Sequence, residues 1–324
     1  MTSEVKLYDT EVFSSKLGDQ IKKLILMKRA SGRSYKSAAA ALKQLDRFIS
    51  QNDHSDEIAI TQELVDKWCV LRPNERWKSY ICRVSALRIL GEFMQKAGLP
   101  AVIPDPVRRS NKDQYKPHIF SSTELSLIVK AAKELPVNPY SGFRDRVMPI
   151  GIRLLYLSGM RIGELLKLRI RDFDPYTCRI TILGAKNDKD RIIYIHPEFA
   201  KTLKSFIDTF HVMASSDDYI FIVRRGVQMS ASVFHRAFVQ CLKRAGIKHI
   251  PGQGPRVHDL RHTFCVNLMR YWHQENIDVN SMLPALSAHL GHTSISETMV
   301  YLQYEIRDLI SLQNRLSSSS DGPI

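Results

Sequence analysis

The chain has few cysteines and no long apolar run. Its 324 residues include five cysteines, Cys69, Cys82, Cys178, Cys241 and Cys265, and no two of them form a C-x-x-C pair. This scatter argues against a structural zinc site on cysteine and predicts reduced, mostly buried thiols in a cytoplasmic protein. No segment supplies the roughly eighteen apolar residues that a membrane span requires. The first residues, MTSEVKLYDTEVF, also lack the apolar centre of a signal peptide.

Acidic side chains are scarce relative to basic ones. The sequence holds 47 Lys and Arg against 33 Asp and Glu, which gives a formal net charge of +14. Such an excess favours a polyanionic partner, most commonly nucleic acid, with an anionic membrane surface as the alternative. Hydrophobic residues make up 44% and charged residues 25%, so the composition is that of a globular protein with one large or two ordinary domains.

Helical periodicity dominates the first third of the chain. Apolar residues recur at helical spacing within residues 11–30, 34–50, 61–71 and 77–98, which predicts a small four-helix bundle. Thr61 is a predicted N-cap, and Gly98 is a helix-stop signal. The stretch LPAVIPDPVRRSNKDQYKPHIF then breaks the periodicity with four prolines and a basic cluster. We expect a helical domain at 1–104, a basic linker at 105–118, a larger domain at 119–316 and a disordered tail at 317–324.

The larger domain is predicted to be mainly helical with a small antiparallel sheet, an α+β fold. SSTELSLIVKAAKEL pairs an N-cap at Ser121 with Glu124 three residues later, which is a capping-box pattern. FRDRVMPIGIRLLYLSG is mostly apolar and predicts a buried helix. CRITILGAKNDKDRIIYI has β-branched alternation on both sides of a polar centre, so we expect a β-hairpin with a longer loop.

An arginine opens an apolar helix in LSGMRIGELLKL. Arg161 follows a Ser-Gly break, and the apolar Leu165, Leu166 and Leu168 come after it. A positive charge at the start of a helix is poorly placed for the helix dipole. Two interpretations remain at this point: a local ion pair with Glu164, or a charge directed at an anion.

Two histidines and an arginine share one helix face in HDLRHTF. His258 and Arg261 are three residues apart, and His258 and His262 are four apart. The second spacing resembles the H-E-x-x-H zinc pattern. However, Asp259 stands where that pattern has glutamate, and Arg261 would bring a positive charge beside a metal ion. A solvated polar helix start is the remaining alternative.

The stretch LSAHLGHTSISETMVYLQY holds two histidines and two tyrosines. His289 and His292 are three residues apart, as are Tyr301 and Tyr304. Gly291 is a predicted helix terminator, and a serine after it is expected to cap a further helix that carries the tyrosines. A tyrosine on an amphipathic helix is usually a packing residue, so this stretch alone does not identify a reactive one.

The sequence resembles the tyrosine recombinase (phage integrase) family in five motifs and in their order. They are GMRIGELLKL, a lysine-bearing hairpin, HDLRHTF, LGHTS and MVYL. The resemblance extends from about Lys116 to Tyr304. The segment LPALSAHLGH looks most like the corresponding part of integrases from transposons and related mobile elements. The resemblance implies a SAM-like core-binding domain at 1–104 and a catalytic domain at 119–316. It also implies DNA cleavage and rejoining through a covalent 3′-phosphotyrosyl intermediate, without a metal, ATP or any other cofactor.

The resemblance assigns a catalytic set residue by residue. The matched residues are Tyr301, Arg161, Lys186, His258, Arg261 and His292, with Glu164 as a supporting residue. Tyr301 is the implied nucleophile, and the two arginines would bind the scissile phosphate. His289 and Tyr304 fall outside the family register. We therefore expect His289 to be a structural helix residue, and Tyr304 remains the neighbour that competes with Tyr301.

The hairpin lysine is less well defined than the other positions. Lys186 aligns with the family lysine when Arg191 is taken as the end of the G-K-G-x-K-x-R pattern. Ala185 and Asn187 replace the glycines on either side of it, so Lys189 competes with Lys186 for the role.

Basic residues outside this set predict contacts to DNA phosphates. They occur in KRASGRSYKS, in NERWKSYICRVSALR and in the linker. The predicted DNA-binding residues are Arg29, Arg33, Lys36, Arg76, Lys78, Arg83, Arg108 and Arg109. Each of them alone is also compatible with a solvated helix face, so the prediction depends on the whole set.

Double-stranded DNA is the expected partner, and recombination of two duplexes implies a homo-tetramer that is a monomer or dimer off DNA. The apolar face of EIRDLISLQNRL after Tyr304 is expected to dock onto a neighbouring protomer or to pack within its own chain. Three alternatives to a recombinase remain: a type IB topoisomerase, a non-catalytic DNA-binding relative and a zinc hydrolase.

Overall fold

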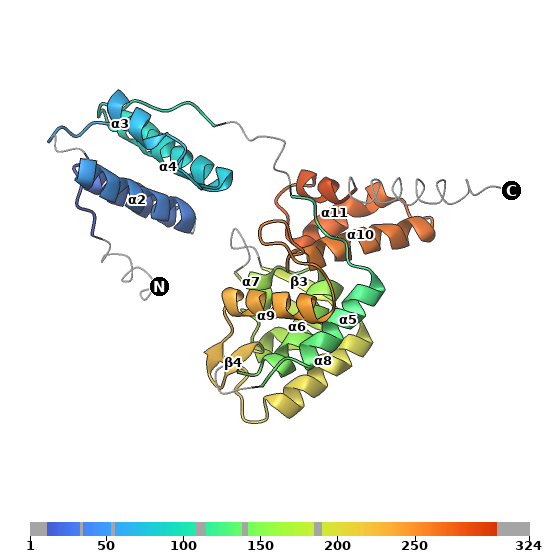
Figure 1. Cartoon of the computed structure of the whole chain (residues 1–324). Coiled ribbons are helices and arrows are strands. Elements are labelled where there is room, and N and C mark those ends of the chain that lie inside the picture. The colour runs from blue at the N-terminus through green and yellow to red at the C-terminus, as the bar shows by residue number, and fades with distance from the viewer. Residues whose placement is uncertain are drawn as a thin grey trace. The chain divides into compact units, whose positions relative to one another are not determined.

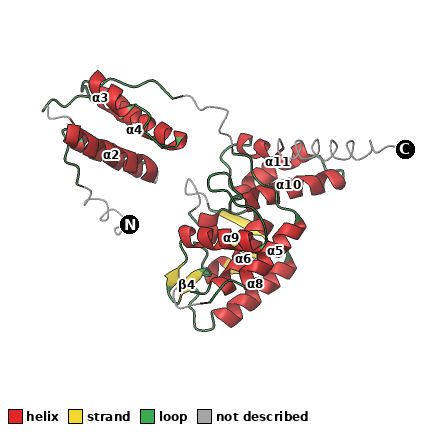
Figure 2. Ribbon diagram, in the orientation of Figure 1, coloured by secondary structure: helices red, strands yellow, loops and turns green. Residues whose placement is uncertain are grey.

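The computed structural model describes residues 12–32, 35–52, 56–107, 115–137, 142–184 and 190–302. The chain divides into two compact units, residues 1–114 and 115–324, and this boundary falls inside the predicted linker. Figure 1 shows the first unit in blue to blue-green and the second in green to red. Helices dominate both units, and strands are few and short (Figure 2). The predicted fold class, mainly α with small antiparallel sheets, is confirmed.

The first unit contains the four predicted helices. They are α1 (Gly18–Ala30), α2 (Lys36–Asn52), α3 (Gln62–Trp68) and α4 (Trp77–Lys96). Apolar faces of all four form one buried core. The Thr61 side chain accepts a hydrogen bond from the Leu64 amide, which confirms the predicted N-cap. Helix α1 begins later than predicted, since the Asp46 carboxylate accepts hydrogen bonds from the Ser14 and Ser15 amides and holds this segment outside the helix.

Arg83 requires a correction, because it is a core residue of the first unit and does not face outward toward DNA. Its side chain is 2% exposed. The guanidinium forms two hydrogen bonds with the Glu75 carboxylate, at 3.0 and 2.8 Å, and donates to the carbonyls of Trp68 and Val70. It also lies 4.9 Å from the centroid of the Trp68 ring. A charge enclosed by these partners links α3 to α4 and is not available to phosphate.

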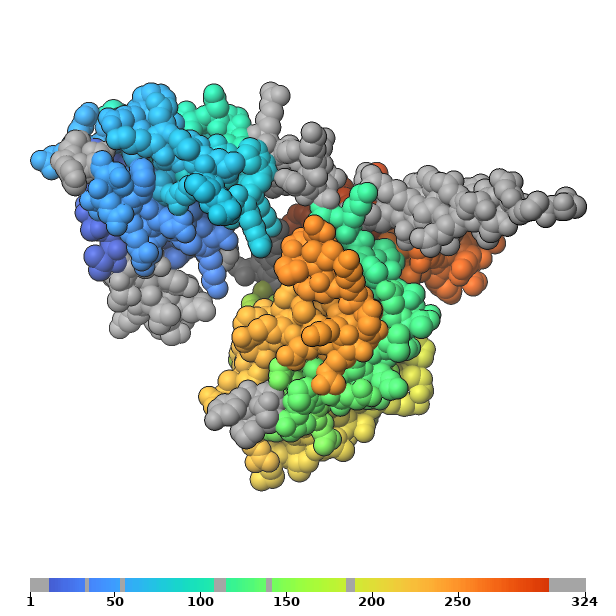
Figure 3. All heavy atoms as spheres, viewed as in Figure 1, coloured from blue at the N-terminus to red at the C-terminus, as the bar shows by residue number. Residues whose placement is uncertain are grey.

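The second unit is built around a buried helix. Its helices are α5 (Ser122–Lys133), α6 (Arg144–Ser158), α7 (Ile162–Leu165), α8 (Pro197–Phe210), α9 (Ala231–Arg244), α10 (Asp259–Gln274) and α11 (Val279–Leu290). The mostly apolar α6 contacts α5, α9 and α10. Although α5 and α9 are far apart in sequence, they lie side by side and share the surface seen in Figure 3. The capping box at Ser121 and Glu124 is confirmed.

Two small antiparallel sheets complete this unit. Strands β1 (Phe173–Asp174), β2 (Arg179–Ile182) and β3 (Arg191–Tyr194) form one sheet, and β4 (Ile222–Arg224) pairs with β5 (Val227–Gln228). The predicted hairpin is confirmed, because β2 and β3 pair with Ile182 opposite Arg191. Between these strands, Lys186 and Lys189 lie outside the described residues, as do Tyr304 and the predicted tail.

The described helices and cysteines add two observations. None of the described helices combines the length and apolar character needed to cross a membrane. All five cysteines carry free thiols, of which Cys241 and Cys265 are buried and the other three half-buried.

Candidate active site

Four separate segments of the second unit bring the predicted catalytic side chains together. Arg161 directly precedes α7, and Arg261 lies in the first turn of α10 just after His258. His292 follows the end of α11, and Tyr301 lies in the last described helical segment, 296–302. The sequence predicted this set from motifs up to 140 residues apart (301 minus 161), and the fold brings them to one place.

Arg261 is the most enclosed of these side chains, with 2% of its surface exposed. Its Nη1 donates to the Gly159 carbonyl at 2.8 Å, and its Nη2 donates to the Leu290 carbonyl at 2.9 Å. Burial lowers its pKa, although the guanidinium remains charged at any ordinary pH. Arg261 therefore ties the glycine before Arg161 to the end of α11 and keeps a fixed positive charge between them.

His292 has a defined hydrogen-bonding state. Arg261 Nη2 lies 2.8 Å from His292 Nε2, and a guanidinium can only donate. Nε2 is therefore the acceptor, so we infer that the neutral ring carries its proton on Nδ1, which donates to Thr298 Oγ1 at 2.8 Å. Burial and the Arg261 charge lower the pKa of His292 to about 4, in agreement with a neutral imidazole.

Glu164 lies between two arginines. Its carboxylate is 8% exposed and accepts from Arg161 Nη1 at 3.0 Å and from the Arg161 amide at 2.8 Å. Arg191 binds the same carboxylate with both Nη atoms, at 2.9 and 2.7 Å. Burial alone would raise the pKa of Glu164, but the hydrogen bonds and charges of the two arginines lower it to about 2. The local ion pair expected for Arg161 thus exists, but it does not use the whole guanidinium.

Tyr301 is packed against the histidines of the cluster. Its side chain is 4% exposed, and its ring centroid lies 5.3 Å from that of His262 and 6.1 Å from that of His292. Burial and the neighbouring Cys265 raise the pKa of Tyr301 to about 12, and Arg261 acts in the opposite direction. The phenol is therefore protonated at neutral pH and needs a base in order to react as a nucleophile.

His258 lies at the solvent-exposed edge of the cluster. Its ring is in edge contact with His262, with centroids 5.0 Å apart. Partial desolvation, followed by the charges of Arg261 and Arg161, lowers the pKa of His258. Burial lowers the pKa of His262 further, to about 3. Both rings are neutral at physiological pH, so His258 can accept a proton from a hydroxyl nearby.

The geometry around Asp259 does not favour the zinc alternative. The Asp259 carboxylate accepts hydrogen bonds from the Tyr115 hydroxyl and from the Arg256 amide, and it is fully buried. Within the described part of the chain, no group of three His, Cys, Asp or Glu side chains is arranged to hold a metal ion. His289 donates through Nε2 to the Ser158 carbonyl at 2.8 Å and stacks on Phe264, as a structural helix residue would.

The other predicted DNA contacts stay predictions. Lys36, Arg76 and Lys78 are exposed, and Arg29 is half-buried. Arg33, Arg108 and Arg109 lie outside the described residues, as does Lys186, the predicted hairpin lysine.

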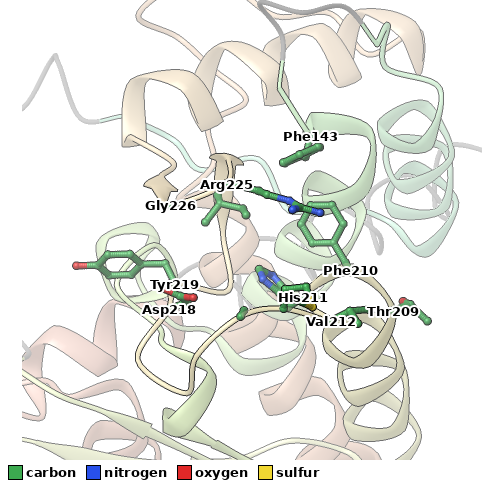
Figure 4. Close-up of a pocket in the computed structure, with 12 residues that line it drawn as sticks. Phe143, Thr209, Phe210, His211, Val212, Asp218, Tyr219, Arg225 and Gly226 are labelled. Carbon is green, nitrogen blue, oxygen red and sulfur yellow. The ribbon is translucent and has the colours of Figure 1, made fainter.

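A separate pocket of about 390 Å³ opens beside the end of α8. Figure 4 shows Phe210 and His211 on one side of it, and Arg225 and Gly226 from the β4–β5 turn on another. His211 Nε2 donates to the Ile220 carbonyl at 2.9 Å, so this ring serves the local fold. None of the predicted catalytic residues lines this pocket.

Three residues of the cluster had no assigned role in the sequence prediction. They are Arg191, which marked only the end of the hairpin pattern, His262 and Thr298. His262 had a usable signal in its four-residue spacing from His258. Nothing local in the sequence marks Thr298, because its contact with His292 depends on how the chain turns after α11.

Comparison with known proteins identifies the family. The family model described as "Phage integrase family" matches residues 119–306 of this chain. The chain belongs to the phage integrase family. It is accordingly a tyrosine recombinase, a class of enzymes that break and rejoin DNA.

Relatives of this integrase family member cover most of its length. It is 26% identical over 292 residues to a Sinorhizobium fredii protein named "Putative integrase/recombinase y4rB", and the match covers 87% of this chain and 91% of that protein. It is also 26% identical over 222 residues to the tyrosine recombinase XerC of Staphylococcus aureus, which covers 68% of each.

Two solved structures share the fold at low sequence identity. XerH recombinase bound to its difH substrate has a TM-score of 0.62 at 19% identity, covering 86% of this chain and 78% of that one. The Tn1549 transposon integrase in complex with a circular intermediate DNA also has a TM-score of 0.62, at 15% identity, covering 89% and 95%.

Proposed function

We propose that this protein is a site-specific DNA recombinase that works through a covalent 3′-phosphotyrosyl intermediate and requires neither a metal ion nor ATP. The observation that carries the proposal is the convergence of Arg161, Arg261 and His292 beside Tyr301 at the end of α11. This set combines permanent positive charge, a neutral imidazole and one buried phenol.

The two arginines would hold the scissile phosphate. As a phenol oxygen attacks phosphorus, negative charge accumulates on the non-bridging oxygens. Arg161, whose side chain is 25% exposed, keeps part of its planar fork open to solvent, and Arg261 supplies a second charge that is fixed in position. Preorganised donors of this kind typically lower the barrier by about 3 kcal/mol each. Cationic side chains would thus take the place of a metal ion.

Proton transfer would be divided between two side chains. His258 accepts the Tyr301 hydroxyl proton as the phenol oxygen bonds to phosphorus. The bond from phosphorus to the 5′-oxygen breaks, and Lys186 or Lys189 donates a proton to give a free 5′-hydroxyl. Attack by another strand's 5′-hydroxyl reverses these steps, so the phosphoester is conserved without ATP.

DNA binding by the first unit and tetramer formation belong to the same proposal. XerH and the Tn1549 integrase were solved with DNA, which supports DNA as the partner. The net charge of +14 and the exposed Lys36, Arg76 and Lys78 support a clamp on phosphates. Under this proposal residues 1–104 bind DNA, 105–118 form the linker and 119–316 catalyse. Four protomers would act on two duplexes.

The test is to trap and map the covalent adduct. The protein is incubated with a pool of nicked duplexes with a randomised core, and the protein–DNA adduct is digested to identify the modified residue. We expect DNA on Tyr301, loss of the adduct in Tyr301→Phe with DNA binding retained, and adduct formation in the presence of chelators. An adduct that persists in Tyr301→Phe and disappears in Tyr304→Phe would contradict the assignment. Relaxation of supercoiled DNA of any sequence would favour the topoisomerase alternative.

A further inference from the structure

Arg191 lies among the charged groups of the cluster, where it binds Glu164 and the end of α11. It is the first residue of β3, and its side chain is 9% exposed. Both Nη atoms bind Glu164, and Nε donates to the His289 carbonyl at 2.8 Å. These contacts use three of its five N–H groups, and the side chain is almost fully buried, so Arg191 has little surface left to act as a third phosphate clamp.

Three arginines converge on the last carbonyls of α11. Arg191 takes the His289 carbonyl, while Arg261 and Arg161 share the Leu290 carbonyl, at 2.9 and 3.3 Å. Arg161 also reaches the Gly291 carbonyl at 3.4 Å. These carbonyls lack partners within the helix and carry the negative end of its dipole, so guanidinium groups are favourable there. The end of α11 thus holds the guanidinium groups of Arg161, Arg261 and Arg191 in fixed positions relative to one another.

The Glu164 carboxylate is shared between Arg191 and Arg161. Arg191 donates one hydrogen bond to each carboxylate oxygen, and Arg161 donates only from Nη1 and its backbone amide. If Arg191 were absent, Arg161 would be the one remaining cationic partner that the described structure provides for this buried carboxylate. A bidentate pair is the favoured geometry for arginine and carboxylate, so Glu164 would then draw the whole Arg161 guanidinium toward itself.

We propose that Arg191 is a positioning residue, which binds Glu164 and thereby leaves the outer part of the Arg161 guanidinium directed at the DNA phosphate. The inference rests on the proposed function and extends it to a residue outside the catalytic set. It predicts that the damage from losing Arg191 is caused by Glu164, so removal of the Glu164 charge should repair it.

The first part of the test is a double-variant comparison. The substrate is the nicked duplex that the wild-type protein selects from the randomised pool, and the readouts are single-turnover adduct formation and DNA affinity. We expect Arg191→Gln to slow adduct formation about 100-fold, because the clamp is misplaced, with DNA affinity unchanged. The double variant Glu164→Gln/Arg191→Gln should regain at least about tenfold of that rate. Arg179→Gln, an exposed arginine on the neighbouring strand β2, is the matched control and should match the wild type.

The second part uses a methylphosphonate at the scissile position. This neutral group needs less cationic stabilisation than a phosphate. If a variant is slow because Arg161 is misplaced, its loss of rate relative to the wild type should be smaller on the methylphosphonate substrate. We expect this for Arg191→Gln and for Arg161→Gln. A general loss of folding would reduce the rate on both substrates equally.

Each outcome decides between the proposals. A wild-type rate for Arg191→Gln, a double variant no faster than Arg191→Gln, or an unchanged defect on the methylphosphonate overturns the role of Arg191. Failure of the wild-type protein to form any adduct overturns the recombinase proposal itself. If thermal unfolding shows that Arg191→Gln is not folded, Arg191→Lys is used in its place. Lysine keeps the charge but not the bidentate fork, and a wild-type rate for that variant would also refute the inference.

Discussion

At the scale of single residues, hydrogen-bond partners determine the tautomer of His292. His292 lies between a donor that cannot accept, Arg261, and a hydroxyl, Thr298, that can. One neutral tautomer satisfies both contacts. These two contacts therefore fix the orientation of the ring, as supporting contacts do for a functional side chain.

Thr298→Val tests this arrangement. Valine removes the acceptor for His292 Nδ1–H at nearly constant volume, so the ring loses its fixed orientation. We expect adduct formation to slow about tenfold, as is typical for loss of such a supporting contact. Thr298→Ser keeps the hydroxyl and serves as the control. Equal rates for Val and Ser would show that the contact has no influence on the reaction.

The buried histidines also predict how stability responds to acid. Burial, His258 and Arg261 lower the pKa of His262 to about 3, whereas an unfolded histidine titrates near 6.5. Below about pH 6.5 the unfolded chain therefore binds more protons than the folded chain, and stability falls as the pH drops toward 3.

We expect His262→Asn to make this dependence less steep, while the other histidines with lowered pKa values still contribute to it. Between pH 6.5 and 5 the wild-type protein should lose at most about 2 kcal/mol through this one group. The measurement is urea unfolding at several pH values for both proteins. Stability curves that run parallel between pH 6.5 and 5 would mean that His262 is not the source.

At the scale of elements, Gly291 at the end of α11 meets two requirements. Its backbone has a positive φ, and its missing side chain leaves room for Arg191. Gly291 has φ +64°, and a Cβ added there would lie 2.9 Å from Arg191 Nη1. Gly226, in the β4–β5 turn, has φ +70° but has nothing within 4 Å of the same position. The two glycines therefore separate backbone strain from the contact with Arg191.

Gly226→Ala should lower stability by about 1 kcal/mol through backbone strain alone. Gly291→Ala should lower it by about 1–3 kcal/mol more, because the methyl group displaces Arg191. Thermal unfolding measures the difference, and adduct formation should be impaired in Gly291→Ala only. Equal losses of stability in the two variants would argue against the contact.

Helices α3 and α4 allow the correction for Arg83 to be tested. Arg83→Gln leaves the half-buried carboxylate of Glu75 without its main partner and should destabilise the protein by about 1–3 kcal/mol. Lys78→Gln, an exposed residue on the same helix, should leave stability unchanged and weaken DNA binding. Thermal unfolding and a DNA-binding titration of both variants distinguish the two roles, and a stable Arg83→Gln protein with weaker DNA binding would restore the original prediction.

At the scale of the whole molecule, the charge of +14 predicts binding that depends strongly on salt. If the basic residues contact six to ten phosphates, affinity for a random duplex should fall by about 10³–10⁵-fold between about 50 and 200 mM salt, because counterions are released on binding. Fluorescence anisotropy on a labelled duplex measures the slope. A flat salt dependence would mean that the excess charge serves another purpose.

The sequence by itself determined the family, the fold class and part of the cluster, but not Arg191, His262 or Thr298. Helical spacing and caps are local, so Thr61, Ser121 and the β2–β3 hairpin were all predictable from neighbouring residues. The sequence motifs were sufficient to select Arg161, Arg261, His292 and Tyr301. The roles of these residues are a proposal.

Only the tertiary structure decided which charges face inward. Arg83 and Lys78 look alike in the sequence, yet one is enclosed by Glu75 and Trp68 and the other is exposed. In the same way, Arg191 meets a carboxylate 27 residues away in the chain, at Glu164. Periodicity identifies the face of a helix on which a residue lies, but the partner on that face depends on packing between distant segments.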